Sequence, residues 1–328
     1  MAFLVTKYLS PSRRQIFSFV TKFAVSGILA WWLIGQVDIS ESADRLAKLD
    51  LVYGFLALLS FIALIAISSI RWHILCRALS INIHLINTIR INFVANFLGQ
   101  VLPAGIGIDA VKVWIITKKG ASAGQAVSGV ALDRLIGLAA LLLLIAVFLP
   151  FLFLLIEDNN ARIAIILILV AGVGALSFIF LISMIPKKFG RFSTMRKIAS
   201  DVGNARKVLL SPRPSLLTLF SSLIIHLFSI LVIHLLSSGI GIEINFLTLM
   251  TLIPPVMLLA TLPISVAGWG VREGAMVAAL GYIGINSGDA LALSVLFGFV
   301  TIAASIPGAL LWIAIGHKQD LKDRMNTK

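Results

Sequence analysis

The sequence predicts an all-α polytopic membrane protein with about six full spans, two re-entrant broken-helix segments and an inverted-topology internal repeat. Hydrophobic residues make up 59% of the chain and charged residues only 12%, and the mean hydropathy is +1.04. Water-soluble domains do not have this composition. Apolar runs of about 20 residues recur, the length that crosses about 30 Å of hydrocarbon as a helix. Gly120 and Gly284, and likewise Ala126 and Ala290, lie 164 residues apart, which is half of the 328-residue chain.

Each predicted span is an apolar run bounded by charged or turn-forming residues. Trp31 and Trp32 lie near the far end of the first span, where they suit an interfacial aromatic belt. Arg71 ends the second span, and the basic loop 186–214 follows the fourth. We expect one integral membrane domain over 1–328, with repeat halves at about 16–149 and 162–316. The predicted spans cover 16–37, 51–70, 126–148, 163–185, 216–237 and 289–315.

Two apolar segments are interrupted by proline and glycine, one around Pro103 and one at 246–285. Irregular backbone at membrane depth is tolerated only where it is buried in protein or lines a watery cavity. We therefore expect two broken helices beside a polar path, the first reopening as a helix at Asp109. The predicted helix breaks are Pro103, Gly105 and Gly107 in the first segment, and Pro263, Gly268 and Gly270 in the second.

The distribution of lysine and arginine predicts the orientation. If both broken segments re-enter on their own side, 21 of the 27 Lys and Arg residues lie in cytoplasmic loops and tails, and only Arg45 and Lys48 lie outside. A single crossing by the first segment would instead place Lys112, Lys118 and Lys119 outside. Each half then has three spans. Because three is odd, the second half enters the membrane inverted, as in many secondary transporters.

Asp133 and Arg134 fall about two turns inside the third span, and Arg272 with Glu273 follows the second break. Charges at such depth are costly unless they pair or face a polar cavity, so a functional role is expected. Asp133 with Arg272, and Arg134 with Glu273, would neutralise one another. The alternative is that these charges only hold the two halves together. The second half has no charges at the corresponding positions, so the site would be asymmetric.

Asp109 and Lys112 follow the first break. A helix start attracts anions such as phosphate, although Asp109 could cap that helix itself, and both readings stay open. Asp109 and Glu273 are the candidate proton carriers, since burial can raise a carboxylate pKa toward neutrality. The single Cys76 excludes an intrachain disulfide and a cysteine-based metal site. Finding no catalytic constellation, metal cluster or nucleotide loop, we expect a transporter without cofactors rather than an enzyme.

Three ordered segments, LPAGIGID at 102–109, DRLIG at 133–137 and LPISVAGWGVRE at 262–273, together resemble the membrane region of the lysylphosphatidylglycerol synthetases, the flippase-like domain family. The resemblance covers essentially the whole chain. It implies a lipid-translocating domain whose headgroup is unspecified. We expect this domain in the cell inner membrane, with both termini cytoplasmic as the distribution of lysine and arginine predicts. Asp109, Lys112, Asp133, Arg134, Arg272 and Glu273 would line its substrate path.

The chain departs from the family pattern at several positions. Ala104 and Ile108 stand where glycines are usual, and Lys112 stands where arginine is common. No soluble aminoacyl-transferase domain follows Lys328, so lysyl transfer is not expected.

The sequence leaves several functions open. The leading hypothesis is a flippase-like transporter of a phosphate-bearing lipid, either a phospholipid or a polyprenyl-phosphate-linked lipid, with Arg134 or Arg272 meeting the phosphate. The alternatives are a non-transporting accessory of envelope lipid or glycolipid biosynthesis and a membrane glycosyltransferase, for which the acidic loop 38–50 gives thin support. Expected partners are anionic membrane lipids and envelope lipid or glycan enzymes. The net charge of +13 is assigned to cytoplasmic loops, not to nucleic-acid binding.

Overall fold

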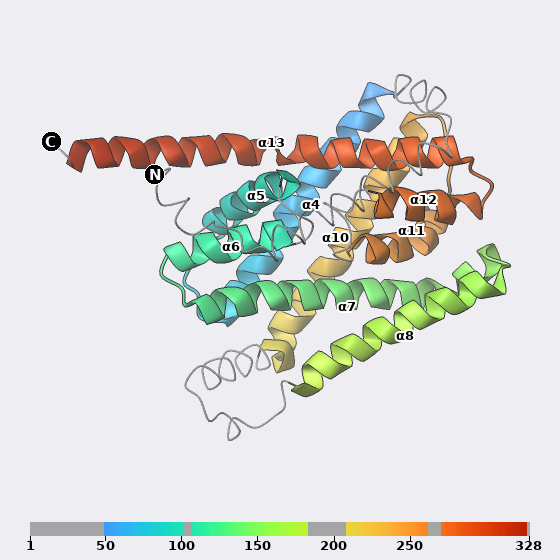
Figure 1. Ribbon diagram of the computed structural model, residues 1–328, viewed down its shortest axis with the longest axis horizontal. Coiled ribbons are helices and arrows are strands. Elements are labelled where there is room, and N and C mark those ends of the chain that lie inside the picture. Colours follow the sequence, from blue (N-terminus) through green and yellow to red (C-terminus); the bar gives the residue numbers. More distant parts are fainter. Residues whose placement is uncertain (1–48, 102–105, 183–207, 262–269, 327–328) are drawn as a thin grey trace, which may run out of the picture.

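A computed structural model describes residues 49–101, 106–182, 208–261 and 270–326 (Figure 1). Throughout these ranges the regular structure is α-helical and no strand occurs, which confirms the all-α part of the predicted fold class. The helices are α4 (Leu51–Ala78), α5 (Leu85–Val101), α6 (Ile106–Lys118), α7 (Ala123–Leu155), α8 (Asn159–Ile182), α10 (Pro212–Gly239), α11 (Phe246–Ala260), α12 (Val271–Gly281) and α13 (Ser287–Asn326).

Five of these helices, α4, α7, α8, α10 and α13, are long and apolar enough to cross a membrane. They correspond to five of the six predicted spans, and the remaining one, 16–37, lies outside the described residues. The helix itself extends past the predicted end of the second span at residue 70, because α4 continues to Ala78. Arg71 does not end the helix, since its charge is neutralised within the bundle by Asp133.

Side-chain caps fix where several helices begin. The Asp50 carboxylate accepts a hydrogen bond from the Val52 N–H at the start of α4. Ser122 and Gln125 form a reciprocal capping box at the start of α7, and Asn245 accepts from the Leu247 N–H at the start of α11. Each cap satisfies an amide that has no partner within its own helix, so a polar residue sets the start of each of these three helices.

The central pair of the bundle is α4 and α10, which run antiparallel (Figure 1). At one end the Asp50 N–H donates to the Gly239 carbonyl at 2.9 Å. Seven residues before the other end of α4, Arg71 Nη1 donates to Ser222 Oγ at 2.8 Å. Figure 1 shows α7 and α13 flanking this pair and running in opposite directions. The main hydrophobic core follows the central pair and extends onto α11, α12 and α13.

The four short helices form two packed pairs, α5 with α6 and α11 with α12. Residues 80–84, before α5, and 119–121, after α6, line one pocket. The first pair is therefore a hairpin that begins and ends at the same end of the bundle. Moreover, α5 packs against α13, and α11 packs against α7. The contact between α5 and α13 is so close that a Cβ on Gly308 would lie 2.0 Å from the Phe93 carbonyl oxygen.

Candidate functional site

A buried ionic triad lies where α4, α6 and α7 meet. Arg71 Nε donates to Asp133 Oδ1 at 2.8 Å, and Lys112 Nζ lies 3.5 Å from Asp133 Oδ2. The exposed fractions of Arg71, Lys112 and Asp133 are only 8%, 4% and 5%. Arg71 also donates to Ser222 on α10, which ties a fourth helix to the triad. Burial of this kind is tolerated because each charge has a close partner.

The triad holds two cations for one carboxylate. Besides Asp133, Lys112 has the Trp72 ring as a partner, with Nζ 4.9 Å from the ring centroid, a cation–π contact. The ring quadrupole attracts the ammonium but does not cancel its charge. The triad therefore places two basic side chains beside one carboxylate inside the bundle.

Arg134 lies next to the triad in sequence but turns to a different partner. Its Nε donates to Asp109 Oδ2 at 2.9 Å, and its Nη2 donates to Asp109 Oδ1 at 3.0 Å, so the guanidinium binds the carboxylate in a bidentate manner. The Arg134 side chain is half-exposed. The planar arginine fork matches carboxylate and phosphate equally well. Arg134 can therefore exchange one acceptor for the other without changing its geometry.

The second ionic group lies at the start of α12. The Glu273 carboxylate accepts from Arg272, from the Ser294 hydroxyl and from the Gly270 N–H. Gly270 has a φ of 89°, a left-handed conformation that glycine adopts without strain. The Arg272 guanidinium also stacks 5.5 Å from the centroid of the Phe297 ring. Glu273 thus caps α12 while it neutralises Arg272.

A cavity of about 260 Å³ lies beside Arg272, lined mostly by apolar side chains of α7, α10, α11, α12 and α13. His226 lies on its wall, with Nε2 3.0 Å from the Gly137 carbonyl oxygen. Gly137 in turn adjoins Arg71, because a Cβ there would lie 3.4 Å from Arg71 Nη1. His226 therefore connects the wall of this cavity to the surroundings of the triad.

Residues 19–308 match the protein family described as the lysylphosphatidylglycerol synthase TM region. The chain belongs to this family. This match confirms the predicted resemblance. The family is membrane-embedded and related to lipid flippase-like function. A search of the curated proteins gave no match.

In this family member, the predicted charge pairing is replaced by another. Asp133 was expected to pair with Arg272 but pairs with Arg71 and Lys112, and Arg134 binds Asp109 rather than Glu273. The cause is that α4 and α6 both pack against α7 and bring their own charges within reach. Glu273, meanwhile, is already neutralised by the neighbouring Arg272.

Sequence reasoning missed Arg71, which it assigned to a loop. The signal was present, because Trp72, Leu75, Cys76 and Leu79 continue a helical apolar pattern past the charge. A charge that does not interrupt such a pattern indicates a buried pair rather than a helix end.

The predicted helix breaks are placed as follows. Gly107 lies inside the first turn of α6, which begins at Ile106 rather than at Asp109. Gly270 lies immediately before α12. Pro103, Gly105, Pro263 and Gly268 lie outside the described residues. Within the described part of the chain, no three His, Cys, Asp or Glu side chains gather where they could hold a metal ion.

Proposed function

We propose that this protein is a flippase-like transporter that moves a phosphate-bearing lipid between the leaflets of the cell inner membrane. The observation that carries the proposal is the buried triad of Arg71, Lys112 and Asp133, with the half-exposed Arg134 fork next to it. Apolar helices do not retain three buried ionisable groups for packing alone, because each one is costly there. Three basic side chains and two carboxylates meet at the site, and the basic side chains can donate hydrogen bonds to a phosphate.

The proposed mechanism is an exchange of acceptors. Arg134 releases Asp109 and binds the lipid phosphate with the same two-armed geometry, while Arg71 and Lys112 add positive potential. The headgroup then passes to Arg272, whose partner Glu273 is likewise replaceable by phosphate. The apolar cavity beside Arg272 receives the hydrophobic part next to the headgroup. Hydrogen bonds to charged groups contribute about 1.5–3 kcal/mol each, so removing either arginine should slow transport roughly 10–100-fold.

An inverted repeat would give this exchange two alternating openings. Its support is the matching order of a long helix, a short pair and a long helix in 51–155 and 212–326. The equivalent helices α4 and α10 run antiparallel, and each short pair packs against the last long helix of the other half. The short helices have 17, 13, 15 and 11 residues, all below the roughly 20 needed to span. We therefore interpret both pairs as re-entrant, with the halves rocking against each other.

The test is reconstitution of the purified protein in liposomes with fluorescent phosphatidylglycerol or fluorescent polyprenyl phosphate, followed by chemical quenching of the outer leaflet. The wild type should lose signal beyond the outer-leaflet half, and Arg134→Ala and Arg272→Ala should do so roughly 10–100-fold more slowly. Arg162→Ala is the matched control, because within the described part of the chain Arg162 donates to the Ile156 and Phe153 carbonyls near the connection between α7 and α8, away from the triad.

Wild-type rates in both arginine variants would remove these residues from the path. If folded wild-type protein moves neither lipid, the transport proposal fails for these cargoes and the accessory function becomes the better hypothesis.

A further inference from the structure

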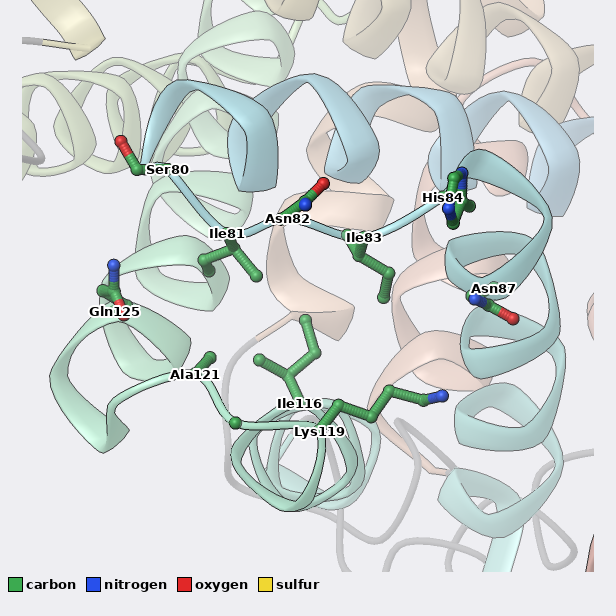
Figure 2. Close-up of a pocket in the computed structure, with 11 residues that line it drawn as sticks. Ser80, Ile81, Asn82, Ile83, His84, Asn87, Ile116, Lys119, Ala121 and Gln125 are labelled. Carbon is green, nitrogen blue, oxygen red and sulfur yellow. The ribbon is translucent and has the colours of Figure 1, made fainter.

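A second cavity, of about 490 Å³, opens between the connection 79–84, which joins α4 to α5, and the connection 119–122, which joins α6 to α7 (Figure 2). We propose that this pocket binds the phosphate of an anionic headgroup before it reaches the triad. Its role as an entrance rests on the proposed function, whereas the binding itself can be measured without transport.

The lining has the chemistry of an anion site. Lys119 supplies a cation, and Asn82, His84 and Asn87 supply side chains that can donate hydrogen bonds. None of the residues that line the pocket is acidic. Figure 2 shows the Lys119 side chain extending across the pocket toward the side formed by His84 and Asn87. A phosphate placed there would meet a cation and several donors without repulsion from a carboxylate.

The backbone adds to this potential. Helix α5 begins at Leu85, at the edge of the pocket, and has no acidic residue in its first turn. The His84 carbonyl accepts from the Asn87 and Thr88 N–H groups, so the preceding amides have no partner within the helix. The positive end of the helix dipole therefore reinforces Lys119.

The pocket lies about one turn of α6 away from Lys112 of the triad. Its floor contains Ile81, Ile83 and Ile116, which are buried and belong to the same hydrophobic cluster as Trp72. Ile116 follows Lys112 by one turn of α6, a rise of about 6 Å. One layer of isoleucine side chains therefore separates the pocket from the buried cations. A headgroup held here is one helical turn from the site where Arg134 and Lys112 would receive it.

The binding test uses the full-length protein in an uncharged, phosphate-free detergent. Ala121, on the pocket wall, is replaced in an Ala121→Cys variant that carries an environment-sensitive maleimide dye. Cys76 is fully buried, so the wild type is the labelling control. The probes are inorganic phosphate, glycerol 3-phosphate and a short-chain phosphatidylglycerol, with a short-chain diacylglycerol as the phosphate-free control. A saturable response to the phosphate probes, and none to diacylglycerol, is expected.

The matched pair Lys119→Gln and Lys118→Gln decides the assignment. Lys118 has the same charge but stacks on Trp114 and does not line the pocket. Lys119→Gln should raise the Kd at least about tenfold, and Lys118→Gln should raise it less than about twofold. His84→Gln should also weaken binding. Equal losses in the two lysine variants would overturn the proposal, because surface potential alone would explain them. The absence of any saturable response would also overturn it.

The probes also identify the source of the phosphate. Tighter binding of phosphatidylglycerol than of glycerol 3-phosphate assigns the site to a lipid headgroup and supports the entrance role. Equal affinities retain the phosphate site but overturn the entrance role, because the ligand is then a soluble phosphate compound. Since no transport occurs in detergent, failure of lipid transport in liposomes would refute the proposed function and leave this binding result intact.

Discussion

Replacing Asp133 with asparagine should strongly destabilise the protein. The side chain keeps its size but loses the charge that faces Arg71 and Lys112, both of which are buried. Removing one partner of a buried ion pair costs about 3–5 kcal/mol, because an uncompensated charge stays behind. That is a large share of the 5–15 kcal/mol that typically separates folded from unfolded protein. The double variant Asp133→Asn, Arg71→Met should recover part of the loss, since it removes one of the two stranded cations.

Cys76 provides the assay. It is the only cysteine in the sequence and is fully buried, so a dye that fluoresces on reaction with thiols reports unfolding during a thermal ramp. At about 2 °C per kcal/mol, Asp133→Asn should lower the midpoint by roughly 6 °C or more. Asp109→Asn is the control, because its half-exposed partner Arg134 makes that pair worth only about 0–1 kcal/mol. Equal midpoints for the two variants would refute the conclusion that the triad is a buried, tightly coupled unit.

Two further predictions test the packing and the orientation. Gly308→Ala should destabilise the protein by about 1–3 kcal/mol in the same thermal assay, because its Cβ would meet the Phe93 carbonyl oxygen, which no rotamer change can move. The control is Gly174→Ala, which should be neutral or stabilising because nothing lies within 4 Å of the added Cβ. If Gly174→Ala lowered the stability as much as Gly308→Ala, the result would contradict the close contact between α5 and α13. In right-side-out vesicles, an impermeant maleimide should label Glu157→Cys at once and Ala121→Cys only after permeabilisation, and the reverse order would invert the proposed orientation.

The sequence was sufficient for the helical class and for the five described spans, because long apolar runs have few other stable structures. It also named Asp109, Lys112, Asp133 and Arg134 as site candidates, but it did not name Arg71. What it could not give were their partners, because ion pairing depends on which helices pack together. Asp133 meets Lys112 only because α6 folds back against α7, a contact that no local pattern encodes.

The end of α4 shows the same limit in another form. Read locally, Arg71 is a charge at the end of an apolar run, and such a charge usually marks the membrane surface. Read in three dimensions, it has a carboxylate and a serine hydroxyl as partners, so the helix continues. Similarly, glycine disfavours helix, and this predicted a break at Gly107. In the first turn of α6 the free-energy cost of one glycine is only about 1 kcal/mol, which the packing of the helix offsets.

The two proposed halves share a scaffold but differ in chemistry. In the first half, α7 presents Asp133 to Arg71, whereas 164 residues later α13 presents Phe297, whose ring packs against Arg272 and Phe61. Identical sites in both halves would hold a headgroup equally well from either leaflet and favour neither side. A cation-rich site in one half and a single Arg272 beside an apolar cavity in the other bind a phosphate unequally. In the proposed transport, the cation-rich first half would therefore capture the headgroup and the second half would pass it on, while the driving force would set the direction of net movement.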